Sequence, residues 1–213
     1  TLPNGERYVD FTSDESWGPK LDGTPVRQAF SFFPQDPEYG QLTPFVAYPE
    51  NIKSYYRTGH NVNNGISVMG GSENTSFRVS FNDTRVSGVE PNSWLKRNNL
   101  GVSAGLDLSD KLNVSTNLNY AGNRAQRPPQ GYGAKSMVQW LPRSVDINRL
   151  KNYEYPDGTF VNWNISRPNS TTGELNSLQP LYWVNPFVET HENLDADRRD
   201  RFFGDVGATY QAT

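Results

Sequence analysis

Residues 98–109 read Asn-Asn-Leu-Gly-Val-Ser-Ala-Gly-Leu-Asp-Leu-Ser, and after Asp110-Lys111 residues 112–120 read Leu-Asn-Val-Ser-Thr-Asn-Leu-Asn-Tyr. Apolar and polar residues alternate through both stretches, and Thr116 is the one polar residue on the apolar face. Period-two alternation predicts β-strands whose two faces have different surroundings. Strands of soluble proteins are usually about 5 or 6 residues long. Two strands of about ten residues, joined by a tight turn and polar along one whole face, match a transmembrane β-hairpin better.

Three further segments alternate in the same way and predict strands at about 61–69, 75–85 and 202–211. In chain order, the links between the five expected strands are short, long, short and very long. Up-and-down barrels of outer membranes show this order, because their periplasmic turns are short and their extracellular loops are long. On that rule the first and fifth strands run inward, and Thr213 lies at the periplasmic side.

The expected fold class is therefore all-β, a partial transmembrane antiparallel β-barrel with long extracellular loops. Five strands cannot close a barrel, and open strand edges are not viable in hydrocarbon. We expect the rest of a longer polypeptide to complete the barrel, because the sequence has neither an initiator Met nor a signal peptide. The expected parts are an extracellular loop region at 1–60, four barrel strands in two hairpins at 61–122, a long extracellular loop at 123–201 and the fifth barrel strand at 202–213.

Composition limits the function classes. The 213 residues carry a net charge of -3 and contain no cysteine. The nearly balanced charge offers no basic stripe for nucleic acid. Without cysteine there are no disulfides, thiolate metal sites or cysteine nucleophiles. The mean hydropathy is -0.75 and no apolar run approaches the ~18 residues of a membrane helix, but this does not argue against a barrel, in which every second residue faces the lumen.

The two long expected loops are rich in aromatic residues, which disordered segments lack. We therefore expect ordered loops, with one short helix near 136–145. Exposed Trp and Tyr side chains can stack on sugar rings or pack against a peptide. Trp163, Tyr182 and Trp183 are the candidate contacts for a substrate or partner. The alternative is that the aromatic residues form the cores of the loops themselves.

Other chemistry finds little support in the sequence. His60 and His191 are the only histidines, and solvated loop histidines are the default interpretation. The acidic residues at 195, 197 and 200 could suggest Ca²⁺, but arginines alternate with them and favour salt bridges at the start of a strand. No hydrolase, Walker or dinucleotide motif is present. We therefore expect no enzyme activity, no cofactor and no metal.

Four runs, in order along the chain, resemble SusC/RagA-type TonB-dependent outer-membrane transporters of Bacteroidetes. They are Ser-Trp-Gly-Pro-Lys-Leu-Asp-Gly at 16–23 and the runs at 63–80, 88–99 and 193–202. The resemblance implies an early portion of a 22-stranded barrel with an N-terminal plug. It implies import of oligosaccharides or oligopeptides across the bacterial outer membrane, driven by TonB through the N-terminal part. It also implies a SusD-like surface lipoprotein over the extracellular loops.

Two alternatives remain open from the residues alone. A soluble β-sandwich module that binds glycans would also have alternating strands, but with the apolar face packed inward. An extracellular glycosidase domain would need two carboxylates that converge in a cleft. The identity of the substrate, glycan or peptide, cannot be read from the sequence.

Overall fold

The computed structural model describes residues 1–127 and 139–212. They divide into two compact units, which we call the loop unit and the sheet unit. The loop unit consists of Thr1–Arg57, Glu90–Asn92 and the described part of Pro128–Leu194. The sheet unit consists of Thr58–Val89, Ser93–Arg127 and the described part of Asp195–Thr213. All segments with period-two alternation therefore belong to one unit, and both long expected loops contribute to the other.

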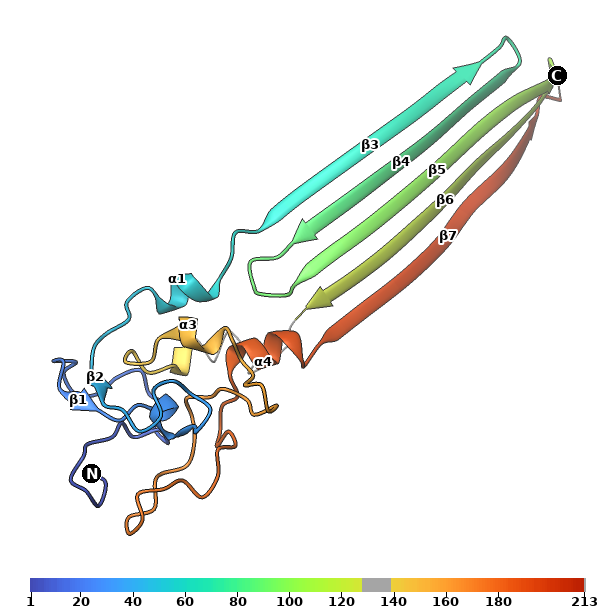
Figure 1. The fold of residues 1–213 in the computed structure, drawn as a ribbon. Helices are drawn as coiled ribbons and strands as arrows, with labels where there is room; N and C mark the ends of the chain where they lie inside the picture. The colour runs from blue at the N-terminus through green and yellow to red at the C-terminus, as the bar shows by residue number, and fades with distance from the viewer. Residues whose placement is uncertain (128–138, 213) are drawn as a thin grey trace. The chain divides into compact units, whose positions relative to one another are not determined.

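The sheet unit is one five-stranded sheet in which spatial neighbours are also neighbours in the chain (Figure 1). Every neighbouring pair is antiparallel. The expectation of an all-β chain with an antiparallel sheet is confirmed. The strands are β3 (His60–Gly71), β4 (Thr75–Ser87), β5 (Trp94–Ser109), β6 (Leu112–Arg127) and β7 (Asp195–Tyr210).

The strands are longer than the alternation predicts. β5, β6 and β7 each contain 16 residues. The additional pairs lie at one end of the sheet, where Lys96 is opposite Arg124 and Arg124 is opposite Arg198. Charged residues there replace apolar ones on the same face. The hydrophobic alternation therefore stops while the backbone pairing continues.

The short and long links attach to opposite ends of the sheet. Residues 72–74 join β3 to β4, and Asp110-Lys111 join β5 to β6. At the other end, residues 88–93 join β4 to β5, and the chain leaves β6 for the long segment that returns at β7. The segment that precedes β3 also reaches the sheet at this end. The order of link lengths thus agrees with the sequence pattern.

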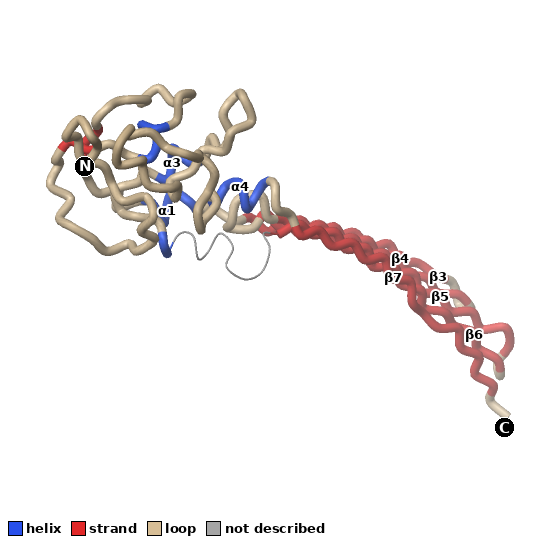
Figure 2. The backbone as a smooth tube through the Cα atoms, turned by 90° about the horizontal axis from the view of Figure 1, so that it is seen from below, coloured by secondary structure: helices blue, strands red, loops and turns tan. Residues whose placement is uncertain are grey.

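The loop unit contains short elements connected by irregular backbone (Figure 2). No helix among the described residues is long and apolar enough to cross a membrane. Of the helix expected at 136–145, residues 136–138 lie outside the described residues, Gln139 and Trp140 are helical, and residues 141–145 form bends and turns instead of a helix. The elements are β1 (Pro25–Val26), the 3-10 helix η1 (Ala29–Phe32), β2 (Thr43–Pro44), α1 (Asn51–Tyr55), α3 (Ile147–Leu150) and α4 (Pro186–His191).

A hydrophobic core holds the loop unit together. It draws side chains from both long segments, among them Phe11, Phe33, Tyr55, Leu150 and Trp163. All five are almost completely buried. Burial of large side chains stabilises a fold by about 1.5–3 kcal/mol each, which explains how segments with so little regular structure become ordered.

In the loop unit, buried asparagine side chains form the hydrogen bonds to the backbone that regular secondary structure forms elsewhere. The Asn164 Nδ2 donates to the Phe11 carbonyl at 2.7 Å, and its Oδ1 accepts from the backbone of Tyr182 at 2.8 Å. The Asn185 Nδ2 donates to the carbonyls of Leu150 at 2.9 Å and Val161 at 2.8 Å. Buried backbone groups must be paired, and a side-chain amide can donate and accept at once. These asparagine side chains therefore form hydrogen bonds with backbone groups that no β-ladder or helix pairs.

Candidate functional site

One face of the sheet unit is apolar and exposed. In an antiparallel sheet, residues directly opposite each other share a face. The register places Val79 opposite Val102, Val102 opposite Leu118, and Thr116 opposite Val206. We call this surface the apolar band. Its members include Ile66, Val68, Phe77, Val79, Phe81, Leu100, Val102, Ala104, Leu106, Val114, Thr116, Leu118, Tyr120, Phe202, Val206, Ala208 and Tyr210.

The apolar band is not a protein core. Phe202 is 73% exposed and Val206 is 76% exposed. Soluble monomers rarely expose a contiguous apolar patch larger than a few hundred Å². A band that spans five strands therefore indicates that another apolar phase or surface covers it.

Aromatic residues mark both ends of the apolar band. We call residues that lie opposite one another across the strands a row. Phe81, Tyr120 and Phe202 lie in the row at one end of the band, and Tyr210 lies in the row at the other end. Phe202 and Tyr210 lie eight positions apart along β7, which is about 26 Å along the strand at ~3.3 Å per residue. Strands that cross a membrane in a tilted barrel are about 9–11 residues long, and their lipid-facing bands carry aromatic girdles at both interfaces. The nine residues from Phe202 to Tyr210 therefore agree with the length of such a strand.

The opposite face of the sheet is polar and hydrogen-bonded across strands. Arg78 donates to the Ser67 hydroxyl at 3.2 Å, and Thr84 donates to the Asn63 Oδ1 at 3.1 Å. Asn117 donates to an Asp205 carboxylate oxygen at 3.3 Å. Such a surface is suited to water and not to an apolar phase. The two faces of the same strands therefore require different surroundings.

The three aromatic residues proposed from the sequence have different environments. Trp163 is 1% exposed and belongs to the core of the loop unit, so its ring is closed to any ligand or partner. Its Nε1 has no hydrogen-bond partner among the described residues, so packing holds the ring in place. The expectation of a contact role is wrong for Trp163, and the alternative, that the loop aromatics form a core, describes it.

Tyr182 and Trp183 remain candidates. Tyr182 is 69% exposed. Trp183 is half-buried, donates from Nε1 to the Asp14 carboxylate at 2.8 Å and stacks with Trp140 at a ring-centroid distance of 6.3 Å. Their ring environments thus differ, and only the Tyr182 ring is largely open to solvent.

A pocket of about 640 Å³ in the loop unit was not predicted from the sequence. Residues 16–22 line it, which is most of the first run quoted above, together with residues near the start of the chain and Arg143. Trp17 is 91% exposed. None of the three proposed aromatic residues is among its lining residues. The signal that could have found it is an aromatic residue inside a Gly- and Pro-containing loop flanked by charges.

Positive and negative side chains line this pocket together. Its charged lining residues are Arg7, Asp10, Glu15, Lys20, Asp22 and Arg143. The aromatic rings of Tyr8, Trp17 and Phe45 accompany them. Mixed charges with aromatic rings suit an uncharged polar or a zwitterionic ligand, because a strongly charged ligand would meet like charges.

Two carboxylates of the pocket, those of Asp10 and Asp22, are held ionised. Burial alone would raise the pKa of Asp10, but hydrogen bonds from Arg167 and Thr12 outweigh burial and lower the pKa. The Arg167 guanidinium meets both Asp10 oxygens, at 3.2 and 2.7 Å. A hydrogen bond from the Thr24 hydroxyl lowers the pKa of Asp22. A glycosidase needs one carboxyl group with a raised pKa as its general acid, and neither of these two supplies it.

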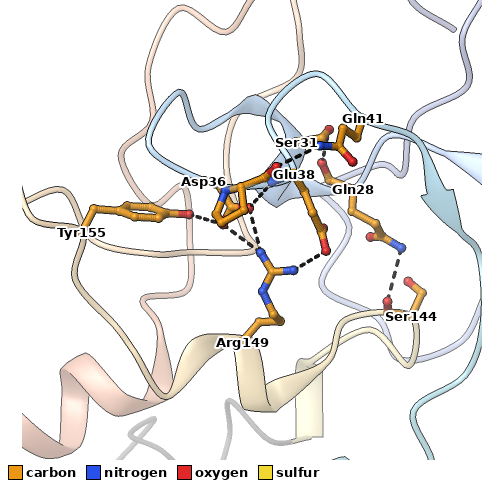
Figure 3. Close-up of polar contacts among 9 residues, drawn as sticks. Gln28, Ser31, Asp36, Glu38, Gln41, Ser144, Arg149 and Tyr155 are labelled. Carbon is orange, nitrogen blue, oxygen red and sulfur yellow. Dashed lines mark hydrogen bonds and ion pairs between the residues drawn. The ribbon is translucent and has the colours of Figure 1, made fainter.

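A second charged group in the loop unit is structural. The Asp36 carboxylate is buried and accepts two bonds from Arg149, both at 2.8 Å, and one from the Tyr155 hydroxyl at 2.7 Å (Figure 3). Burial, and then the bond to Asp36, raise the pKa of the Tyr155 hydroxyl. Desolvation would lower the pKa of Arg149, but the bond to Asp36 outweighs it and the pKa is raised. The network joins residues more than a hundred positions apart, so it connects the two long segments.

Of the two histidines, His191 is held by neighbouring groups of the loop unit. His191 stacks on Tyr153 at 5.3 Å, and its Nδ1 lies 2.8 Å from the Phe187 carbonyl. The described residues hold no cluster of three or more metal-ligating side chains. The acidic residues at the start of β7 form salt bridges, which confirms that interpretation of the sequence. The pairs are Asp195 with Arg127, Asp197 with Arg199 and Asp200 with Arg198.

Comparison with known proteins leaves the family open. No protein-family model matches the sequence, and no curated protein matches it.

Proposed function

We propose that this chain is part of a TonB-dependent importer of the bacterial outer membrane, which takes up oligosaccharides or oligopeptides with a SusD-like surface lipoprotein. The apolar band carries the proposal. An exposed apolar face about 26 Å long along the strands, with three aromatic residues at one end, Tyr210 at the other and a polar face behind it, fits a barrel wall between lipid and a wet lumen. The resemblance of the four sequence runs supports the same assignment.

The edges of the sheet support a larger barrel. β3 and β7 are the edge strands of the five-stranded sheet. Unpaired backbone groups cannot face hydrocarbon, so each edge must pair with a further strand. In the proposed importer, strands of the same polypeptide continue the wall on both sides and close a barrel of 22 strands.

The loop unit is assigned to the extracellular side. Both of its long segments connect to the end of the sheet opposite the short turns, and short turns are periplasmic in outer-membrane barrels. Its aromatic pocket, together with Tyr182 and Trp183, offers surfaces for cargo or for the surface lipoprotein. The mixed charge of the pocket suits sugars and peptides alike.

A transporter is favoured over the other two classes. A β-sandwich would cover the apolar band with a second sheet, but the only other sheet of the described residues has two residues in each strand and belongs to the loop unit. A glycosidase would need a carboxyl group with a raised pKa, whereas the pKa values of Asp10 and Asp22 are lowered.

Cysteine scanning of β6 in the full-length protein, reconstituted into lipid vesicles, tests the proposal. These 213 residues contain no cysteine, so each variant adds one thiol to this part of the protein. Leu118→Cys and Val114→Cys should carry a fluorophore that brominated lipids quench. Asn117→Cys and Ser115→Cys are the matched controls on the other face and should resist this quenching. Equal quenching at all four positions, or a protein recovered in the aqueous fraction, would contradict the assignment and favour a soluble glycan-binding module.

A further inference from the structure

Four cations stand in a line on the same face as the apolar band, beyond its aromatic row. Arg85 is opposite Lys96, Lys96 is opposite Arg124, and Arg124 is opposite Arg198. We call these four residues the basic row. All four side chains are exposed. Neighbouring strands are about 4.8 Å apart, so the row presents four positive charges within about 14 Å.

The basic row is unfavourable unless an anion lies over it. Like charges directly opposite each other on neighbouring strands destabilise a sheet. Asp83 and Asp200, one row nearer the apolar band, offset part of the charge, with contacts of 2.8 Å to Arg85 and 3.0 Å to Arg198. Four cations and two carboxylates leave an excess of two positive charges on these rows. The next row outward, which carries His60, Ser87, Trp94, Gln126 and Ala196, adds no carboxylate.

The position of the row relative to the apolar band identifies the anion. Arg124 lies four positions from Tyr120, and Arg198 lies four positions from Phe202. This is about 13 Å along the strand, and less along the membrane normal because barrel strands tilt by ~40°. Lys and Arg side chains near the end of a membrane segment extend toward the headgroups. The cations thus reach the depth at which lipid phosphates lie.

Trp94 marks the same depth. Its ring lies 5.1 Å from the Lys96 Nζ in a cation–π contact. Tryptophan is enriched where a membrane meets water, because its ring is apolar and its N–H is polar. The indole also holds the Lys96 ammonium on this face of the sheet.

We propose that the basic row binds the phosphate groups of anionic lipids in the leaflet next to the loop-bearing end of the sheet. The proposal rests on the proposed function, because that function turns the apolar band toward lipid. The cations on the other face of the sheet, at positions next to the basic row, are arranged differently from those of the basic row. Asn123 lies between Arg97 and Arg199 in the register, so they form no continuous row.

The test uses the full-length protein in neutral detergent, titrated with phosphatidylglycerol and followed by native mass spectrometry. The variant combines Arg85→Gln, Lys96→Gln, Arg124→Gln and Arg198→Gln. Removal of each cation should weaken the apparent affinity for the lipid about fivefold. The matched control, Arg97→Gln with Arg199→Gln, removes cations of neighbouring positions on the other face and should keep the parent affinity. Arg124→Lys should also keep it, because the charge remains.

Three outcomes would overturn the proposal. A quadruple variant that binds phosphatidylglycerol as tightly as the parent shows that the row is not the site. Inorganic phosphate that displaces the lipid completely at equal concentration shows a site for free anions. Equal binding of phosphatidylcholine and phosphatidylglycerol by the parent shows that charge is not recognised. Insertion of the parent protein into phosphatidylcholine membranes is measured separately. If the parent does not insert, the proposed function is contradicted as well. If it inserts, the proposed function stands whatever the lipid titration gives.

Discussion

The loop unit and the sheet unit place their apolar side chains in opposite ways. The loop unit has little regular backbone, yet it encloses Trp163, Phe33 and Ile147 almost completely. The sheet unit is regular throughout its 12- to 16-residue strands, yet Phe202 and Val206 lie on its surface. Regular secondary structure and a buried core are therefore separate properties. Where the apolar side chains of a unit lie depends on the surrounding phase. This phase is water around the loop unit and, in our proposal, lipid along the sheet.

The largest expected effect tests the core of the loop unit. Trp163→Ala should lower the free energy of opening this unit by about 3–5 kcal/mol, because it removes a large buried ring and leaves a cavity. Hydrogen exchange in the full-length protein measures this at the amide of Val161, which donates to the Tyr153 carbonyl at 2.8 Å. Tyr182→Ala is the control on an exposed ring and should cost less than about 0.5 kcal/mol. Similar costs for both variants would mean that Trp163 is not a core residue.

The next effect tests the sheet unit with neighbouring residues on its two faces. Leu118→Arg places a charge in the middle of the apolar band and should destabilise the protein in lipid vesicles by about 2–4 kcal/mol. Asn117→Arg adds the same charge on the polar face, next to Asp205, and should cost much less. Urea unfolding from vesicles measures both. If the two substitutions cost the same, the band does not face lipid and the contrast between the units disappears.

A smaller effect concerns the polar contacts of the loop unit. Tyr155→Phe removes the hydroxyl that donates to the buried Asp36 carboxylate and should cost about 1.5 kcal/mol, the lower end of the usual range of about 1.5–3 kcal/mol for a hydrogen bond to a charged group. Tyr153→Phe is the control, because its hydroxyl donates to Glu192 at 2.7 Å in an exposed position. Hydrogen exchange should show a clear loss for the first variant and almost none for the second. The reverse order would show that the Asp36 network does not connect the two long segments.

The strands were predictable because one physical rule governs them. Hydrophobic alternation located all five strands and the turn at Asp110-Lys111. It underestimated β5, β6 and β7, because backbone pairing continues into the charged rows of Lys96 and Arg198, where alternation no longer follows hydrophobicity. Strand length depends on pairing partners, and a single strand's sequence does not name them.

The burial of individual loop aromatics was not predictable. Aromatic content predicted ordered loops, but it does not distinguish Trp163 from Tyr182, which have opposite exposures. What separates them is contact with distant residues. Asn164, for example, fixes this segment through a bond to the Phe11 carbonyl, 153 positions away. The pocket at 16–22 was missed for the same reason, since its walls come from segments that only the fold brings together.

The smallest expected effect is a pH dependence of the loop unit. Asp10 and Arg167 form an exposed ion pair with contacts at 3.2 and 2.7 Å. The pKa of Asp10 is lowered from 3.8, so the folded state binds this proton less readily than the unfolded state. The pair therefore stabilises the unit above that value and loses its contribution as the pH falls through the lowered pKa. Because the pair is exposed, its contribution should not exceed about 0.5 kcal/mol.

Asp10→Asn isolates this contribution. At neutral pH the variant should be less stable than the parent by about 0.5 kcal/mol or less, and the difference should vanish below the lowered pKa of Asp10, where the parent carboxyl group is also protonated. Combining it with Arg167→Gln should add almost nothing, because the two substitutions remove the same pair. A difference that grew at low pH would show that Asp10 is stabilised in its protonated form. The pocket would then hold the proton donor that a glycosidase requires. A catalytic role of the loop unit would have to be added to the contrast between a loop unit that faces water and binds a ligand and a sheet that faces lipid and spans the membrane.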